Sequence, residues 1–127
     1  WALTDEVDAV IVELGANDAL RGLDPAQADA ALQEIVGKVT AKTLPVLVAG
    51  MRAPPNMGPD YAAAFESMYA KLEGRPGVLV YPFFLDGVAA EASLNQEDGL
   101  HPTAQGVDVI VERMLPMVES LLTLSKK

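Results

Sequence analysis

The chain contains no cysteine, a single histidine and few basic residues: 9 Lys and Arg stand against 18 Asp and Glu, for a formal net charge of −9. Without cysteine there is no disulfide framework, zinc–thiolate site or thiol nucleophile. Proteins that bind the nucleic-acid backbone carry the opposite charge balance, so no nucleic-acid partner is expected. The longest nearly unbroken apolar run, residues 44–51, is far shorter than the roughly 18 residues of a membrane span, so no integral membrane segment is expected.

Three short apolar runs indicate strands, at residues 7–14, 45–50 and 78–81. The first has little polar alternation, which is typical of a strand covered on both faces in a parallel sheet. Helical patterns follow each run, so strands and helices alternate along the chain. This order predicts an α/β fold with right-handed crossovers, in which helices cover both faces of a parallel sheet.

Helix signals are found at three places. Asp24 and Pro25 are an N-cap and first-turn pair, and a second helix is expected from about Asp60 to a stop at Gly74. The last helix is expected to begin after the His101-Pro102 pair, and Pro116 within it should kink or split it. Three strands with three helices make a thin sheet with one unpaired edge. We therefore expect either a partner polypeptide at that edge or further strands before residue 1.

Two polar clusters follow predicted strands, at the sheet edge where open parallel sheets bind ligands. The first is Gly15-Ala16-Asn17-Asp18, and the second is residues 98–102, which read Asp-Gly-Leu-His-Pro. Asp98 is close enough in sequence to accept a hydrogen bond from Nδ1 of His101, which would leave Nε2 free as a proton acceptor. A structural role for this pair at the start of a helix is the alternative.

Asn17 also allows two interpretations. Asn-Asp after a strand is ordinary turn chemistry, in which the side chains bond to the local backbone. The functional interpretation is a side-chain amide aimed at a developing oxyanion, with Gly15 letting the substrate approach the backbone. Each cluster is ambiguous when taken alone.

Taken together and in this order, the two clusters resemble the third and fifth signature blocks of the SGNH (GDSL) hydrolases. The segments between them, residues 52–58 and 82–88, are similar to the arylesterase and thioesterase/lysophospholipase branch of that family. The resemblance extends from about residue 7 to residue 122. It implies a three-layer α/β/α sandwich of flavodoxin-like type with a parallel sheet.

The resemblance also implies roles for individual residues. His101 would be the general base and then the general acid, Asp98 its orienting carboxylate and Asn17 an oxyanion donor. Gly15 and Asp18 would support the turn that aims Asn17. The reaction implied is hydrolysis of a carboxylic ester or thioester through a serine acyl-enzyme, with a small ester substrate and no metal or cofactor. Pro55, Asn56 and Phe83 are candidates for the lining of an acyl groove.

The Gly-Asp-Ser block that carries the family's nucleophile does not occur in residues 1–127. None of the serines stands in such a context; they are Ser67, Ser93, Ser120 and Ser125. We therefore expect residues 1–127 to be the C-terminal part of a single hydrolase domain, inactive alone and partnered by its own N-terminal fragment. The family's habits suggest a periplasmic or secreted protein. The alternatives are a carbohydrate O-acetyl esterase of the same family and a non-catalytic α/β interaction domain.

Overall fold

The computed structural model describes residues 2–125. Its three strands are β1 (Val10–Val12), β2 (Val46–Ala49) and β3 (Val78–Tyr81), and its four α-helices are α1 (Ala16–Leu20), α2 (Pro25–Ala41), α3 (Pro59–Ala70) and α4 (Ala104–Ser125). Two 3₁₀ turns, η1 (Pro55–Met57) and η2 (Ala92–Leu94), lie in the loops. The alternating order of strands and helices matches the sequence-based expectation.

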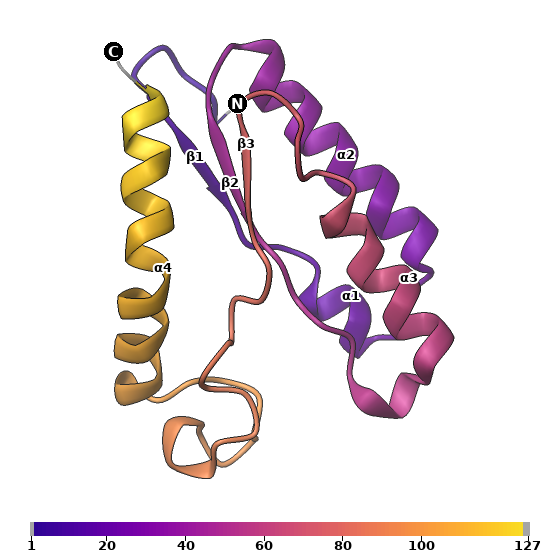
Figure 1. The fold of residues 1–127 in the computed structure, drawn as a ribbon. Coiled ribbons are helices and arrows are strands. Elements are labelled where there is room, and N and C mark those ends of the chain that lie inside the picture. The colour runs from indigo at the N-terminus through magenta and orange to yellow at the C-terminus, as the bar shows by residue number, and fades with distance from the viewer. Residues whose placement is uncertain (1, 126–127) are drawn as a thin grey trace.

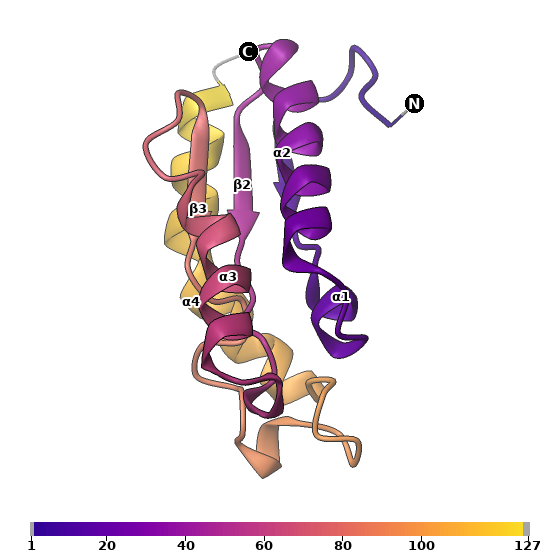
Figure 2. The same cartoon turned by 90° about the vertical axis from the view of Figure 1, so that its right-hand side faces the viewer.

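The strands form one parallel sheet in the order β1-β2-β3, with Val10 opposite Val46 and Val46 opposite Val78. Helices α2 and α3 lie together on one side of the sheet and α4 lies on the other (Figure 1). Turning the molecule by 90° shows the sheet between these two helical layers (Figure 2). The α/β/α layering and the parallel sheet predicted from the sequence are confirmed.

The core is divided by the sheet into two clusters. On the α2/α3 side, the fully buried Val36 and Phe65 pack with Val46 and Val48 of the central strand. On the α4 side, Leu47 packs with Ile110 and Met114, among others. All four residues of β2 are buried, as expected for a strand covered on both faces.

The first strand differs from its prediction. It is three residues long rather than the eight of residues 7–14, and Ile11 is 50% exposed. Helix α4 packs mainly against β2 and β3, which leaves the Ile11 side chain partly open to solvent. Within residues 2–125, β1 has a paired strand on one side only.

An apolar stripe on α4 is also open to solvent. Its exposed members recur at helical spacing, next to the buried stripe that faces the sheet: Val107, Val111, Leu115 and Leu122. Ile11 is paired in register with Leu47, which packs in the α4-side cluster, so Ile11 lies on the same side of the sheet as α4. We call these five residues the open apolar face.

The last helix begins at Ala104, after the His101-Pro102 pair as expected, and Thr103 Oγ1 caps it by accepting a hydrogen bond from Gly106 N at 3.2 Å. Pro116 does not split it, since one α-helix spans residues 104–125. Proline removes one donor from the helix ladder, but Met114 and Leu121, one on either side of it, are both buried in the same cluster, so the two halves of the helix share one packing surface. None of the helices in the described part of the chain is both long and apolar enough to cross a membrane.

Candidate active site

The first polar cluster lies where β1 gives way to α1. The chain turns at Gly15, which precedes α1 with a φ of +113°, a backbone conformation that side chains other than hydrogen rarely permit. Asn17 and Asp18 follow in the first turn of α1. The helix starts at once because Ala19 N donates to Gly15 O at 3.1 Å. Asn17 is therefore presented by a glycine-dependent turn at the carboxyl end of a strand, as the sequence predicts.

The second cluster is held together by Asp98. Its Oδ2 lies 2.5 Å from Nδ1 of His101, and its Oδ1 accepts hydrogen bonds from the backbone N–H groups of Leu100 (2.9 Å) and His101 (3.0 Å). One carboxylate therefore fixes both the turn and the imidazole ring. An ionised carboxylate can only accept, so Nδ1 carries the proton and Nε2 is left as the free acceptor of the neutral ring.

These hydrogen bonds change the acidity of Asp98. The contact with the His101 ring, followed by those with the two backbone N–H groups, lowers the pKa of Asp98 from 3.8 to about 2. The carboxylate is therefore ionised at every pH well above 2. It can stabilise an imidazolium on His101 without itself taking up a proton.

The loop that carries this pair is tied to the start of α4. Gln96 N donates to His101 O at 2.7 Å, and Asn95 and Pro102 form an antiparallel bridge. Thr103 N donates to Leu94 O at 2.9 Å, and a side chain at Gly106 would meet the same carbonyl at 2.3 Å. The loop closes on itself just before α4, which holds His101 at a defined place relative to the sheet.

One cavity, of about 880 Å³, joins the two clusters. Gly15, Asn17 and Asp18 line it from one side, and Leu100 and His101 line it from the other. The rest of its lining is mainly apolar and comes from α2, the loop after β2 and the loop after β3. An imidazole and a side-chain amide thus share one cavity whose walls are mainly apolar, a combination typical of small-molecule sites.

Of the three residues expected to line an acyl groove, the structure places two at the cavity. Pro55 and Phe83 line the cavity, together with Met51 and Phe84, whereas Asn56 is not among the described residues that line it. Asn56 lies within η1, and only the proline before it reaches the cavity.

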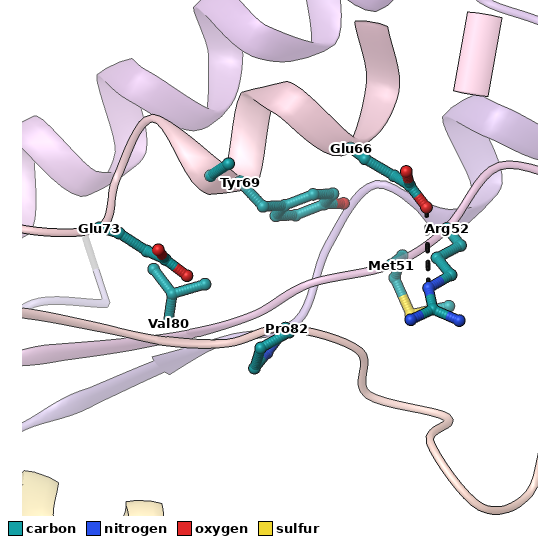
Figure 3. A pocket seen from close by; sticks show the side chains of 8 residues that line it. Met51, Arg52, Glu66, Tyr69, Glu73, Val80 and Pro82 are labelled. Atoms are coloured by element: carbon teal, nitrogen blue, oxygen red, sulfur yellow. Dashed lines mark ion pairs between the residues drawn. The ribbon is translucent and has the colours of Figure 1, made fainter. Parts of the chain in front are cut away.

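Arg52, to which sequence reasoning gave no role, lies at the junction of this cavity with a second one. Its guanidinium carbon is 4.4 Å from the centre of the Phe83 ring, and its Nε is 3.7 Å from Glu66 Oε1. The second cavity, of about 210 Å³, lies between α3 and the strand ends and is also lined by Tyr69 (Figure 3). Nothing in the sequence around this arginine indicates that its side chain stacks on the Phe83 ring.

The described serines lie apart from the cavity that His101 lines. The hydroxyls of Ser67, Ser120 and Ser125 each donate to a carbonyl three or four residues earlier, and Ser93 lies in η2. No serine is among the described residues that line the cavity. In residues 2–125 there is also no group of three or more His, Asp or Glu residues that could hold a metal ion.

Comparison with known proteins identifies the family. Residues 1–109 match the model of the GDSL-like lipase/acylhydrolase family. The chain belongs to this family, the SGNH hydrolases. This match confirms the family resemblance that was inferred from the sequence motifs.

Its relatives include the esterase TesA of Pseudomonas aeruginosa, 37% identical over 89% of this chain and 56% of the relative. The thioesterase 1/protease 1/lysophospholipase L1 of Escherichia coli is 35% identical over 89% of this chain and 54% of the relative. Among solved structures, a crystal structure of TesA superposes with a TM-score of 0.84 at 35% identity, over 92% of this chain and 65% of that one. The chain thus spans about half the length of the curated relatives it matches.

Proposed function

We propose that residues 1–127 form part of a serine hydrolase that cleaves carboxylic esters or thioesters through an acyl-enzyme. The observation that carries the proposal is the 2.5 Å contact between Asp98 and the His101 ring, in the same cavity as Asn17. His101 acts as base and then acid, Asp98 orients it, and Asn17 donates to the oxyanion. Gly15 and Asp18 support the turn that carries Asn17.

The residues act in a fixed sequence. A serine hydroxyl attacks the acyl carbon while Nε2 of His101 takes its proton, and the carbonyl oxygen becomes an oxyanion that accepts a hydrogen bond from the Asn17 amide. The imidazolium, stabilised by Asp98, then protonates the departing alkoxide or thiolate. Water, deprotonated by the same histidine, releases the acid and restores the serine. Acyl chains lie along the apolar wall that includes Phe83.

We further propose that the serine comes from a segment of the same domain that precedes residue 1. Two observations support this: no Gly-Asp-Ser block occurs in residues 1–127, and the relatives are nearly twice as long as the matched region. The open apolar face, which includes Ile11 and Val111, is a surface of the kind that such a segment would cover. Residues 1–127 alone are then inactive.

Active-site labelling tests both proposals. The native protein is treated with a serine-reactive fluorophosphonate, digested and mapped by mass spectrometry, and residues 1–127 expressed alone are treated in parallel. We expect the label on a serine outside residues 1–127, no label on the isolated 127 residues, and loss of labelling in His101→Ala. Label on Ser93 would overturn the assignment of the nucleophile, and no label on the native protein would overturn the serine mechanism.

Substrate class is tested separately. A series of p-nitrophenyl esters from acetyl to palmitoyl measures how kcat/KM depends on acyl length. Each methylene buried in the groove adds about 0.8 kcal/mol of transfer free energy, so activity should rise over the first several carbons. A sharp preference for acetyl esters would favour the carbohydrate O-acetyl esterase alternative.

A further inference from the structure

We propose that Tyr69 is a positioning residue for the oxyanion donor: its hydroxyl fixes the turn that carries Asn17. The proposal rests on the proposed function, because it gives Tyr69 a role only if Asn17 stabilises an oxyanion. Tyr69 lies on α3, far from Asn17 in the sequence, and belongs to neither of the two polar clusters.

The contact is a single hydrogen bond across 55 residues of sequence. The Tyr69 hydroxyl donates to Leu14 O at 2.7 Å, and Tyr69 is only 3% exposed. The ring cannot swing away easily, because it packs edge-on against the fully buried Phe65, with centroids 5.6 Å apart at 74°. Figure 3 shows the Tyr69 ring between α3 and the strand ends.

The acceptor of this hydrogen bond, Leu14 O, lies at the start of the turn that carries Asn17. Leu14 O belongs to the peptide that joins Leu14 to Gly15, so the hydrogen bond sets the plane of the group from which α1 begins. Asn17 follows in the first turn of that helix. A Cβ at Gly15 would lie 2.3 Å from the Tyr69 hydroxyl oxygen. Glycine at this position is therefore needed for the close approach of Tyr69 as well as for its φ of +113°.

The hydroxyl remains a donor throughout the working pH range. Burial, followed by the nearby carboxylates of Glu13 and Asp18, raises the pKa of Tyr69 well above its ordinary value of 10. The phenol is thus protonated at any pH at which His101 could act as a base. The turn is held by a neutral hydrogen bond in a buried setting, where an unpaired carbonyl is costly.

Tyr61 offers a matched control. It lies two turns earlier on α3, stacks on the other side of Phe65 at 6.4 Å, and its hydroxyl donates to Leu23 O at 2.6 Å. Both tyrosines therefore donate to a backbone carbonyl of the segment around α1. Leu23 lies beyond the end of α1, however, so the Tyr61 bond does not set the plane from which the helix starts.

The test compares Tyr69→Phe with Tyr61→Phe in the complete enzyme. Since a misplacement of about 1 Å can cost on the order of 100-fold, we expect Tyr69→Phe to lower kcat by about 10- to 100-fold with KM changed less than about twofold. Tyr61→Phe should retain kcat within about twofold of the parent, by the same reasoning. In an Asn17→Ala background, Tyr69→Phe should lower kcat no further, because there is no amide left to position.

Other outcomes overturn the proposal. Unchanged kcat in Tyr69→Phe, equal losses in the two tyrosine variants, or losses that multiply in the Asn17→Ala background would each show a merely structural role. If the parent enzyme hydrolyses neither esters nor thioesters, the proposed function fails, and amide hydrogen exchange of residues 13–20 then tests whether Tyr69 fixes the turn. Faster exchange there in Tyr69→Phe than in Tyr61→Phe is expected, and equal exchange would show that the hydroxyl does not fix the turn.

Discussion

Replacing Asp98 by asparagine separates the catalytic role of this residue from its structural one. Oδ1 of Asp98 faces two backbone donors, the N–H groups of Leu100 at 2.9 Å and His101 at 3.0 Å. An asparagine can satisfy both only if its carbonyl oxygen takes that position. Its NH₂ group must then occupy the position of Oδ2, 2.5 Å from Nδ1 of the imidazole.

The orientation of the amide determines the state of the ring. An NH₂ group donates, so Nδ1 must accept and the proton of the neutral ring moves to Nε2. Nε2 can then no longer accept the serine proton. A wrong tautomer of this kind costs about 10⁴ in kcat where the aspartate is buried. Because the Asp98 and His101 side chains are 42% and 72% exposed, water competes for the ring, and we expect a smaller loss, of about 10³.

The assay is hydrolysis of a p-nitrophenyl ester by the complete enzyme, with Tm measured alongside. Asp98→Asn should lower kcat/KM by about 10³ while Tm stays close to that of the parent, since the turn keeps its acceptor. Asp98→Ala is the companion variant: it removes the acceptor of the turn as well and should lower Tm. If Asp98→Asn retained activity within about tenfold of the parent, Asp98 would serve the turn alone and the orienting role would be refuted.

Three further predictions follow from the same geometry. In the ester assay, His101→Ala should lose about 10⁴ or more in kcat and Asn17→Ala about 10²–10³, whereas equal small losses would contradict their roles. The ¹³C carboxyl signal of Asp98 should titrate with a midpoint at about 2, and higher in His101→Ala, because the ring makes the largest contribution to the low pKa. With the folded pKa lowered, the stability due to this contact is present above the unfolded pKa of about 3.9 and lost as pH falls through about 2. Finally, Phe65→Ala should lower the free energy of unfolding measured in urea by about 3–5 kcal/mol, because the ring is fully buried and packs against Tyr61 and Tyr69. A loss of less than about 1 kcal/mol would contradict that packing.

The layered fold could be predicted because local and global signals agree in this sequence. The run of residues 45–50 has no polar side chain, and the strand within it is buried on both faces. Asp24 and Pro25 mark the start of α2, where the Asp24 side chain accepts from Ala26 N at 2.9 Å. The same apolar signal was misleading for residues 7–14. A hydrophobic pattern indicates what a strand is suited to contact, and β1 contributes Ile11 to the open apolar face, which is exposed in residues 2–125.

The candidate site could be predicted only in part, because some of its contacts are local in sequence and others depend on the fold. Asp98 and His101 are three residues apart, so the spacing of a single turn suffices to foresee their contact. Glycine before Asn17 likewise signals an unusual backbone locally. Neither signal could show that the two clusters share one cavity, because that depends on the order of the strands and on how far each loop reaches.

The role inferred for Tyr69 illustrates what periodicity alone leaves out. Positions 61, 65 and 69 form an ordinary apolar stripe of α3, and that reading is correct for their rings. It omits the hydroxyls, which are the only polar side-chain atoms of the stripe; that of the buried Tyr69 must find an acceptor. The acceptors are backbone carbonyls, which every residue carries and which no sequence pattern marks. A tyrosine in a buried stripe therefore points to a fixed carbonyl nearby, and here the carbonyl fixed by Tyr69 is the one from which the turn bearing Asn17 begins.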